Sequence, residues 1–527
     1  GRRLAVFSAD LITAYTTFLL LSGGITLIDT LGGTNVSLGL PQWARFLPVP
    51  LSCGLGLIYL ALRGFDEGAD RWRSPVAIVL AALLVWGVPE HMERALYGFD
   101  PALTMAVAFA AAMLIGTPVA FAMLFSAFAA NLAGGFLPEA AVVQNLVNGS
   151  SKFLMLAIPF FILAGALMNA GGLTSRLIDF AYSLVGHMRG GLAQVNVVSS
   201  GLYAGISGSS YSDAALGAKL LVPQMTKHGY SPGFSCAVTA ASATLPNVIP
   251  PSIALLLLAA AGNLSVGKLW IAGIVPGLIM AGVLMALIFV ISVRRGYGAV
   301  IQRVSWAQRG RAALVAAPVL MLALLIIVGI RFGVVTPTEA GVLAVVYAFV
   351  VGTVIYRAWT AKGLLEALRG AAVEAALVGF LIGAASPFAF VLMAEQVPQS
   401  VTAALSGLTS NLFLTLLLVN LLLLLFGLVL DIGAAILILT PLLLPGLVAL
   451  GLDPIHVGII IVINLMLGGL TPPVGMLAFI ASNVSGTPVH DVFRNLIPFL
   501  GALLGALGLI TAIPALSLGL GQLIDIF

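Results

Sequence analysis

Long apolar stretches, separated by short groups of charged residues, run through the whole chain. Two stretches without any Asp, Glu, Lys or Arg cover residues 396–430 and 454–490, which is 35 and 37 residues. A helical membrane span needs about 20 residues, so each stretch holds more than one crossing or a re-entrant pair. Segments of alternating polarity typical of membrane strands are absent, and backbone groups must be paired in lipid. The pattern therefore predicts helices.

The apolar runs place these helices. We expect them at residues 9–30, 46–63, 75–89, 101–115, 118–133, 153–170, 173–187, 192–208, 210–227, 233–262, 269–293, 312–331, 338–357, 365–394, 401–427, 432–448, 455–484 and 492–514. The runs at 233–262 and 455–484 are expected to be broken, and 365–394 to be bent.

Composition supports a protein embedded in a lipid bilayer. The chain is 61% hydrophobic and 8% charged, with a mean hydropathy of +1.14, whereas a soluble domain is about 25% charged. The net charge of +4 comes from Arg and Lys in short loops and gives no reason to expect nucleic acid. Two isolated cysteines, Cys53 and Cys236, offer neither a metal cluster nor a disulfide framework.

An internal repeat is visible in the prolines. Five prolines recur 222 residues later, in the pairs Pro223/Pro445, Pro232/Pro454, Pro250/Pro472, Pro251/Pro473 and Pro276/Pro498. Hydrophobic segments interrupted by Pro or Gly at matching positions of two repeats indicate the binding site of a transporter.

Charge indicates that the two copies are inverted. Lys219, Lys227 and His228 of the first copy correspond to uncharged residues in the second, Pro441, Ala449 and Leu450. Because basic short loops stay on the cytoplasmic side, the two loops are expected on opposite sides of the membrane.

The interruptions themselves are polar and rich in proline. They cover residues 244–252 and 468–475, and each holds a Pro-Pro pair that must break a helix. Free carbonyl ends at membrane depth are tolerated where they line a cavity or coordinate a cation. A proline kink repaired by neighbouring Ser and Thr is the alternative.

A second feature precedes each interruption. Residues 205–213 are small and polar between apolar arms, which predicts the tip of a re-entrant hairpin, and residues 427–431 occupy the same place in the second copy. Asp213 and Asp431 are carboxylates with apolar flanks, and an intramembrane carboxylate indicates function. A helix N-cap is the alternative for both.

Other polar residues are weaker candidates. Asn464, the equivalent of Ser242, is placed to donate to a substrate oxygen, although a buried Asn also joins helices. Glu339 and Glu374 lie near predicted helix ends and are interpreted as structural. Residues 262–269 imitate a nucleotide-binding loop, but Leu269 replaces the Ser or Thr that would bind Mg²⁺. We therefore expect no nucleotide and no enzymatic activity.

Several motifs together resemble one family. Gly205–Ala215 (GISGSSYSDAA), residues 244–253, Thr336–Ala340 (TPTEA) and residues 470–475 (LTPPVG) are similar to the large M subunit of tripartite ATP-independent periplasmic (TRAP) transporters. The resemblance runs from about Pro101 to the C-terminus. Residues 9–63, including the GLPQW motif at 39–43, resemble the last two helices of the small Q subunit.

The resemblance implies a fold and a set of sites. The fold would be an all-α polytopic membrane protein, an inverted-repeat elevator-type transporter with re-entrant hairpins and broken helices. Two Na⁺ sites would use Ser207, Gly208, Ser209, Ser210, Thr244, Asn247 and Pro250, and Asp431, Gly469, Thr471, Pro472 and Val474. The substrate would lie between them, against Ser210, Asp213, Ser242, Asn247, Thr440 and Asn464.

The resemblance also implies a role and partners. Sodium-driven uptake of a small organic acid across the bacterial inner membrane is expected, with substrate delivered by a periplasmic binding protein. A sodium/dicarboxylate-type symporter that needs no binding protein is the alternative. A membrane enzyme or structural subunit lacks any supporting motif.

Three domains follow from this interpretation. Residues 1–63 would be the Q-like helices, 64–100 a connecting segment, and 101–527 the M-like domain with repeats at about 101–300 and 312–527. Residues 63–73 are the predicted linker. The first two Q helices are missing, so we expect the natural protein to extend upstream by roughly 80–100 residues, the length of two spans with their loops.

Overall fold

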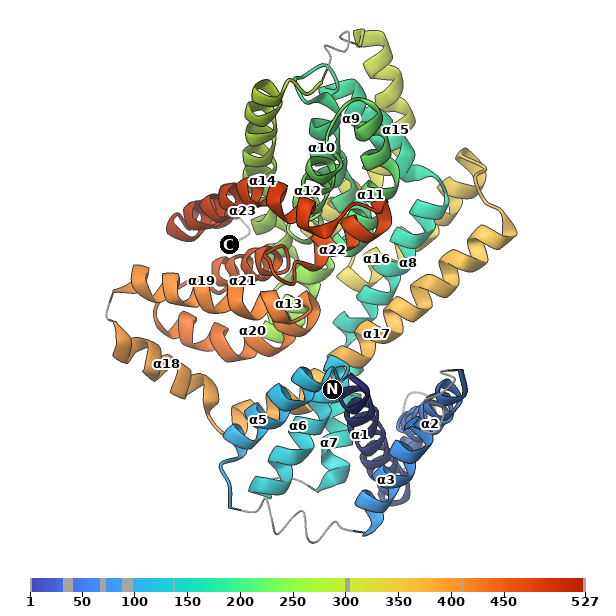
Figure 1. Ribbon diagram of the computed structural model, residues 1–527, viewed down its shortest axis with the longest axis vertical. Coiled ribbons are helices and arrows are strands. Elements are labelled where there is room, and N and C mark those ends of the chain that lie inside the picture. Colours follow the sequence, from blue (N-terminus) through green and yellow to red (C-terminus); the bar gives the residue numbers. More distant parts are fainter. Residues whose placement is uncertain are drawn as a thin grey trace. The chain divides into compact units, whose positions relative to one another are not determined.

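The structure is a computed structural model, and it describes residues 2–31, 41–66, 73–87, 98–135, 138–298, 304–409 and 411–524 (Figure 1). All secondary-structure elements of the described ranges are helices. The prediction of an all-α protein is confirmed.

The chain divides into two compact units. Unit 1 comprises Gly1–Lys152 and Val378–Val401, and unit 2 comprises Phe153–Leu377 and Thr402–Phe527. The long helix α17 (Ala361–Ala394) contributes residues to both units. The remaining helices of unit 1 are α1 (Arg2–Thr30), η1 (Gln42–Arg45), α2 (Pro48–Asp66), α3 (Arg73–Gly87), α5 (Pro101–Ile115), α6 (Val119–Gly134) and α7 (Glu139–Ser150).

Unit 2 carries most of the helices. They are η3 (Phe153–Leu156), α8 (Ala157–Ala170), α9 (Leu173–Val185), α10 (Gly191–Ser207), α11 (Ser210–Lys227), α12 (Pro232–Ser242), η4 (Leu245–Asn247), α13 (Ile253–Gly262), α14 (Val266–Arg295), α15 (Trp306–Arg331), α16 (Pro337–Val350), η5 (Val351–Ile355), α19 (Leu412–Val429), α20 (Ile432–Ala449), α21 (Pro454–Gly468), α22 (Met476–Ser485), α23 (Val489–Ala512) and α24 (Ala515–Leu523). Helix α18 (Val397–Leu408) bridges the sequence boundary between the units.

The repeat is reproduced in the helix bounds of unit 2. Helices α11 and α20 begin and end 222 residues apart, and α12 and α21 both begin at a paired proline. We call α10–α11 hairpin 1 and α19–α20 hairpin 2. Residues 243–252 are break 1, between α12 and α13, and residues 469–475 are break 2, between α21 and α22. Both predicted broken helices are confirmed.

The helices of each copy pack on one another, and the two copies also interlock. Helix α13 of the first copy packs against α20 of the second, and α11 of the first against α22 of the second. Within the second copy, α19 and α20 both contact α21, and the three helices lie side by side in orange and red in Figure 1. Hairpins and breaks of both copies are therefore assembled in one unit.

Some predicted elements need correction. The helix predicted at 401–427 is two helices, α18 and α19, because the Asn411 side chain caps α19 by accepting from the backbone N–H of Phe413 at 2.9 Å. An Asn at this position ends one helix and starts another. Helices α7 and α24 were missed. The linker predicted at 63–73 lies partly outside the described residues, with α2 ending at Asp66 and α3 beginning at Arg73.

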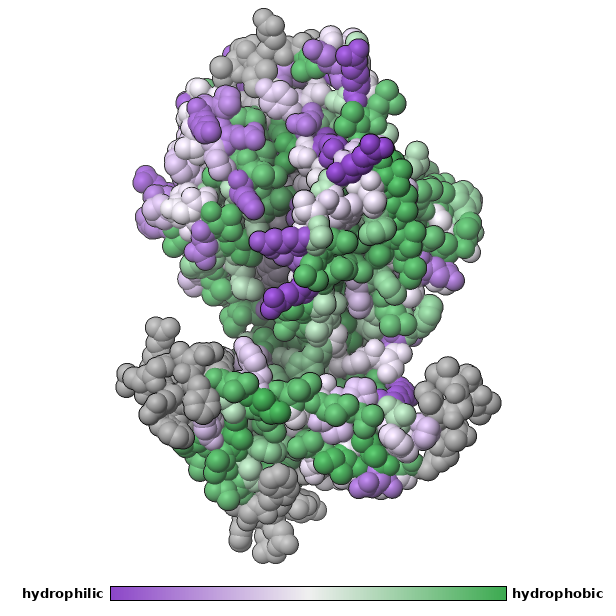
Figure 2. Space-filling model, turned by 90° about the vertical axis from the view of Figure 1, so that its right-hand side faces the viewer, coloured by the Kyte–Doolittle hydropathy of each residue, from purple (hydrophilic) through white to green (hydrophobic). Residues whose placement is uncertain are grey.

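The lengths of the helices and the apolar surface agree with a membrane protein. Ten helices in the described part of the chain are long and apolar enough to cross a bilayer. Apolar side chains, drawn in green, cover much of the face shown in Figure 2. An apolar surface of this kind is stable in lipid and would be unfavourable in water.

Candidate ion and substrate site

The tip of hairpin 1 is only two residues long. Helix α10 ends at Ser207, Gly208 has a φ of 57°, and the Ser209 side chain accepts from the N–H of Ser212 at 3.5 Å to start α11. The tip is shorter than the predicted polar segment 205–213. The turn depends on glycine because a positive φ is unfavourable for other residues.

Break 1 is held by its own side chains. Ser252 caps α13 by accepting from the N–H of Leu255 at 3.1 Å, and its hydroxyl donates to the carbonyl of Asn247 at 2.6 Å. The Thr244 hydroxyl donates to the Ala241 carbonyl at 2.7 Å. The repair of the break by Ser and Thr, one alternative from the sequence, therefore operates here. The Leu245 carbonyl is also used, because it accepts from the N–H groups of Val248 and Ile249 at 3.0 and 2.9 Å.

Hairpin 1 and break 1 are in direct contact. A Cβ added to Gly208 would lie 2.8 Å from the carbonyl oxygen of Pro251, closer than atoms can pack. The Pro250–Pro251 peptide bond beside it is cis. The two segments predicted to share the first ion site thus meet backbone to backbone. For Ser207 only the backbone position is described, as the last residue of α10.

The second copy repeats this arrangement with different contacts. Gly427 of α19 faces Gly468 at the end of α21, and a Cβ on Gly427 would lie 2.7 Å from the carbonyl oxygen of Leu465. In break 2 the Thr471 hydroxyl donates to the Leu467 carbonyl at 2.6 Å, and the Pro472–Pro473 bond is cis. Gly469 and Val474 lie in the same break. Hairpin 2 therefore meets the end of α21 directly before break 2, and within the break a Cβ on Gly469 would lie 3.8 Å from the Ile432 side chain at the start of α20.

Asp431 joins the two hairpins. One carboxylate oxygen caps α20 by accepting from the N–H of Gly433 at 2.9 Å, and the other accepts from the Tyr211 hydroxyl at 2.6 Å. The N-cap interpretation is therefore confirmed for Asp431. An ionised carboxylate has lone pairs beyond the two used here, so it is still able to bind an ion. That role of Asp431 stays a prediction. Tyr211 was missed by the sequence interpretation.

Break 1 and hairpin 1 also reach a helix of the second copy. The Asn247 amide contacts the Met466 sulfur at 2.7 Å, and the Ser210 hydroxyl lies 3.9 Å from the same sulfur. Asn247 and Ser210, both expected at the ions and the substrate, therefore converge on α21. The sequence interpretation did not identify Met466 as a site residue, because only its position shortly before break 2 distinguishes it.

Three of the predicted substrate residues have buried oxygens without a hydrogen-bond partner. They are the hydroxyls of Ser242 and Thr440 and the amide oxygen of Asn464. The other end of the Asn464 amide donates to Asn420 on α19, so this residue also joins two helices. Buried polar atoms without partners are rare in proteins. Ser242 and Asn464 hold equivalent positions before the two breaks.

A large cavity opens beside the tip of hairpin 1. It has a volume of about 570 Å³ and is walled by α8, hairpin 1, the start of α13 and the first part of α17. Polar residues from three of these elements line it, namely Asn169, Ser209, Ser212, Lys219, Glu366 and Glu374. Glu374, interpreted as structural from the sequence, thus faces the cavity. A substrate of a few carbon atoms fits a cavity of this volume.

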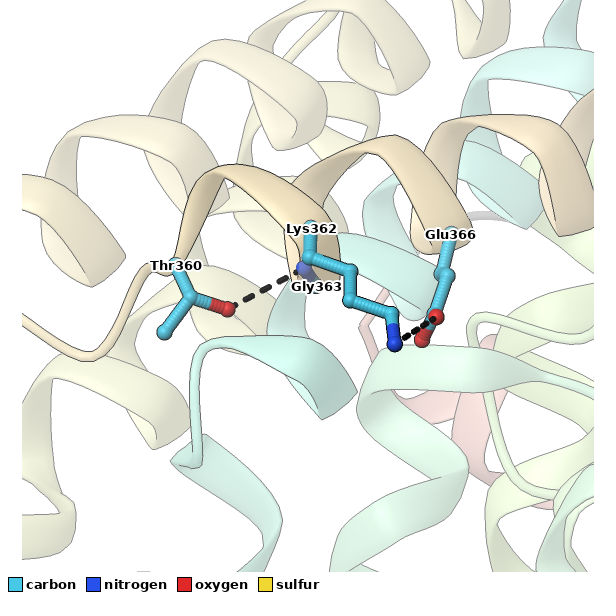
Figure 3. Close-up of polar contacts among 4 residues, drawn as sticks. All are labelled: Thr360, Lys362, Gly363 and Glu366. Carbon is cyan, nitrogen blue, oxygen red and sulfur yellow. Dashed lines mark hydrogen bonds and ion pairs between the residues drawn. The ribbon is translucent and has the colours of Figure 1, made fainter.

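The charges of α17 in this cavity are only weakly compensated. Glu366 pairs with Lys362 one turn earlier at 4.0 Å, and both side chains are exposed, at 69% and 88% (Figure 3). Exposed pairs of this spacing contribute little. The Thr360 hydroxyl accepts from the N–H of Gly363 at 3.1 Å at the start of the same helix. Carboxyl groups of α17 therefore line one wall of the cavity, and Lys219 of hairpin 1 lines another.

Two other sequence candidates are structural. Glu339 forms a capping box with Thr336, whose N–H donates to the Glu339 carboxylate at 2.7 Å. The loop that imitates a nucleotide site links α13 to α14, where Ser265 caps the second helix.

Asp213 lies on α11 but faces a different, smaller cavity from the one beside the tip.

Comparison with known proteins identifies the family. The family model of the tripartite ATP-independent periplasmic transporter, DctM component, matches residues 106–516. The chain belongs to this family. The DctM match spans all the hairpins and breaks described above, so the resemblance noted from the motifs is confirmed. The chain is accordingly a multi-pass protein of the bacterial inner membrane.

Three relatives show the extent of the likeness. The chain is 40% identical over 390 residues (73% of this chain, 90% of the relative) to the C4-dicarboxylate TRAP transporter large permease protein DctM of Pseudomonas aeruginosa. It is 35% identical over 411 residues (78% and 96%) to the sialic acid TRAP transporter large permease protein SiaM of Vibrio cholerae. It is 33% identical over 491 residues (92% and 76%) to the isethionate TRAP transporter permease protein DctMQ of Oleidesulfovibrio alaskensis. The longer match to DctMQ supports an M–Q fusion.

A solved structure shares the fold. The YdaH transporter of Alcanivorax borkumensis superposes with a TM-score of 0.51 at 16% identity, over 74% of this chain and 90% of that one. At this identity the likeness concerns the fold alone.

Proposed function

We propose that this DctM-family protein is the permease of a sodium-driven system that takes up a small organic acid. The substrate would be delivered by a periplasmic binding protein. The family membership and the relatives named for sialic acid, C4-dicarboxylates and isethionate, all organic acids, support the proposal.

The contact of each hairpin with a helix break carries the sodium assignment. Helix breaks expose carbonyl oxygens, which are suitable ligands for a hard cation such as Na⁺. The first ion would lie between the tip at Gly208–Ser209 and the break from Thr244 to Pro250. The second would lie between Asp431 and residues 469–474. Gly208 and Gly427 allow the backbone approach on which both sites depend.

The substrate would bind near hairpin 1, between the two ions. The unpartnered oxygens of Ser242, Thr440 and Asn464 and the side chains of Ser210 and Asn247 would supply its hydrogen bonds. The 570 Å³ cavity beside the tip would be its route to one side of the membrane. Because hairpins and breaks of both copies interlock, they would move together in an elevator mechanism.

Transport in proteoliposomes tests this proposal. The permease is reconstituted with a periplasmic binding protein, and uptake is measured with Na⁺ outside or with Na⁺ replaced by choline or K⁺. We expect uptake to require Na⁺ and to proceed without ATP. Undiminished uptake in choline would exclude sodium coupling. Uptake that needs Na⁺ but not the binding protein would favour the alternative, a dicarboxylate-type symporter.

A further inference from the structure

We propose that hairpin 1 contains a third cation site, in which Asp213 and neutral oxygens of α10 bind one Na⁺ away from both breaks. The inference rests on the proposed sodium-driven function, because it names the same ion. The third site uses other residues than the two Na⁺ sites of that function and lies elsewhere. It also adds one to the number of ions bound.

A small cavity lies inside the packing of hairpin 1 against α9. Its volume is about 10 Å³, which holds one particle of the size of a water molecule. The polar lining residues are Thr174, Asn196, Ser199, Ser200, Tyr203 and Asp213. The 570 Å³ cavity shares none of these residues.

Asp213 is the charged member of this lining. Its side chain is only 6% exposed, and its Oδ2 atom has no hydrogen-bond partner. Ser200 supplies a side-chain hydrogen bond to the carboxyl group. The Asp213 carboxylate is thus nine-tenths buried, half satisfied and directed into the cavity.

The cavity supplies no positive side chain to balance this carboxylate. Its lining residues, all within the described part of the chain, include no Lys, Arg or His. An ionised carboxylate without a positive partner is very unfavourable in a buried site. Lys219, the nearest lysine along α11, lines the other cavity. A bound cation would supply the missing charge.

The neutral groups are arranged as oxygen ligands. The Asn196 amide nitrogen donates to the Thr239 hydroxyl at 2.7 Å, which assigns its Oδ1 as an acceptor. A Cβ on Gly217 would lie 3.7 Å from this Oδ1, so the oxygen points at α11, one turn beyond Asp213. The Ser199 hydroxyl donates to the Asn196 carbonyl at 3.0 Å and keeps its lone pairs.

One carboxylate with several neutral oxygens is a ligand set for a hard monovalent ion. Divalent ions in proteins usually take more carboxylates, and soft ions take sulfur or imidazole. In the described residues, no group of three or more His, Cys, Asp or Glu side chains is placed to hold a metal. These observations favour Na⁺ over Ca²⁺, Mg²⁺ or a transition metal.

The position of the site gives the third ion a role. Ser209, Ser212 and Lys219 line the large cavity, whereas Asp213 and Gly217 line the small one, so the two cavities lie on different faces of α11. An ion bound between Asp213 and Asn196 would cross-link α10 and α11 behind the tip. It would hold the hairpin in the shape that presents Ser209 and Ser210 to break 1.

Equilibrium binding of radioactive sodium to the purified permease in nanodiscs tests the inference. We expect Asp213→Asn to bind one Na⁺ fewer per protein than the unmodified permease, while the remaining sites keep their affinity. Ser212→Ala, on the other face of α11, is the matched control and should bind the full number. Ser199→Ala should weaken one class of site about tenfold, and this variant serves if Asp213→Asn does not fold.

The outcomes separate this inference from the proposed function. Absence of Na⁺ binding by the unmodified permease would refute the sodium-driven function and this site with it. Full Na⁺ binding by both Asp213→Asn and Ser199→Ala would refute only the third site, and would mean that the cavity holds water or that Asp213 is protonated. The number of Na⁺ ions moved per substrate, obtained from reversal potentials, should also fall by one in Asp213→Asn.

Discussion

Asp431 shows how one side chain serves two tasks. Its carboxylate caps α20 and receives the Tyr211 hydroxyl from hairpin 1, so the two hairpin tips are hydrogen-bonded to each other. Hydrogen bonds to an ionised group are stronger than those between neutral groups. The hydrogen bonds from Tyr211 and Gly433 therefore fix the position of the Asp431 carboxylate, which is a proposed ligand of the second ion.

At this scale we predict that Asp431→Asn raises the Na⁺ concentration giving half-maximal uptake about tenfold or more, equivalent to a loss of ~1.4 kcal/mol in ion binding. Asn still caps the helix and still accepts from Tyr211, so only the charge is lost. Uptake measured against Na⁺ concentration in proteoliposomes checks this.

Two variants complete the comparison. Tyr211→Phe removes the bond between the tips but keeps the charge, so it should change the Na⁺ response less than Asp431→Asn. Ser209→Ala removes one neutral oxygen and should also have the smaller effect. If Asp431→Asn keeps the unmodified Na⁺ response, Asp431 is only a helix cap.

At the scale of elements, glycines set how closely hairpins and breaks approach. Gly208 meets the carbonyl of Pro251, and Gly427 meets the end of α21 at Gly468. A side chain at Gly208 would push the tip of hairpin 1 away from break 1, and one at Gly427 would push α19 away from the end of α21. A separation of an ångström is enough to spoil an ion site, because Na⁺–oxygen coordination needs several oxygens at short, similar distances.

We predict that Gly208→Ala abolishes most uptake and weakens Na⁺ binding at least tenfold. The added Cβ would lie 2.8 Å from the Pro251 oxygen, and a φ of +57° is unfavourable for Ala. Uptake and sodium-dependent thermal stabilisation of the purified protein measure the effect.

Gly229→Ala is the matched control for this change. Gly229 also has a positive φ, +86°, but a Cβ there meets nothing within 4 Å. Both variants therefore carry backbone strain, about 1 kcal/mol or more, and only Gly208→Ala separates tip from break. Equal losses in the two variants would show that strain, and not the contact, is responsible.

For the whole molecule, the repeat predicts an inverted arrangement of two loops. Helices α11 and α20 end at Lys227 and Ala449, which occupy equivalent positions in the two copies and are both exposed. The basic residues at the first loop and the apolar residues at the second predict that the loops lie on opposite sides of the membrane.

Cysteine labelling tests this topology. A membrane-impermeant maleimide added to intact spheroplasts should label Ala449→Cys, whereas Lys227→Cys should react only in inverted vesicles. The unmodified chain is the control, because its two cysteines, Cys53 and Cys236, are buried. Labelling of both variants from the same side would mean that the repeats are parallel.

The sequence by itself determined the features that depend on neighbouring residues. Apolar length specifies the spans, the Pro-Pro pairs specify the two breaks, and the 222-residue spacing relates the copies. Hairpin 1 and the start of α12 at Pro232 follow the prediction to within a residue or so. These features could be predicted because proline, glycine and continuous apolarity act on the backbone within a turn or two of themselves.

Only the tertiary structure decided which polar groups meet. Tyr211 and Asp431 are 220 residues apart, and no local pattern marks Tyr211 as the partner of a carboxylate. The sequence could identify Asp213 as a buried acid, but not the face of α11 on which it lies or that one of its oxygens lacks a partner. Such properties arise from the packing of one helix against another, within a copy for Asp213 and between copies for Tyr211 and Asp431, and they exist only once the chain is folded.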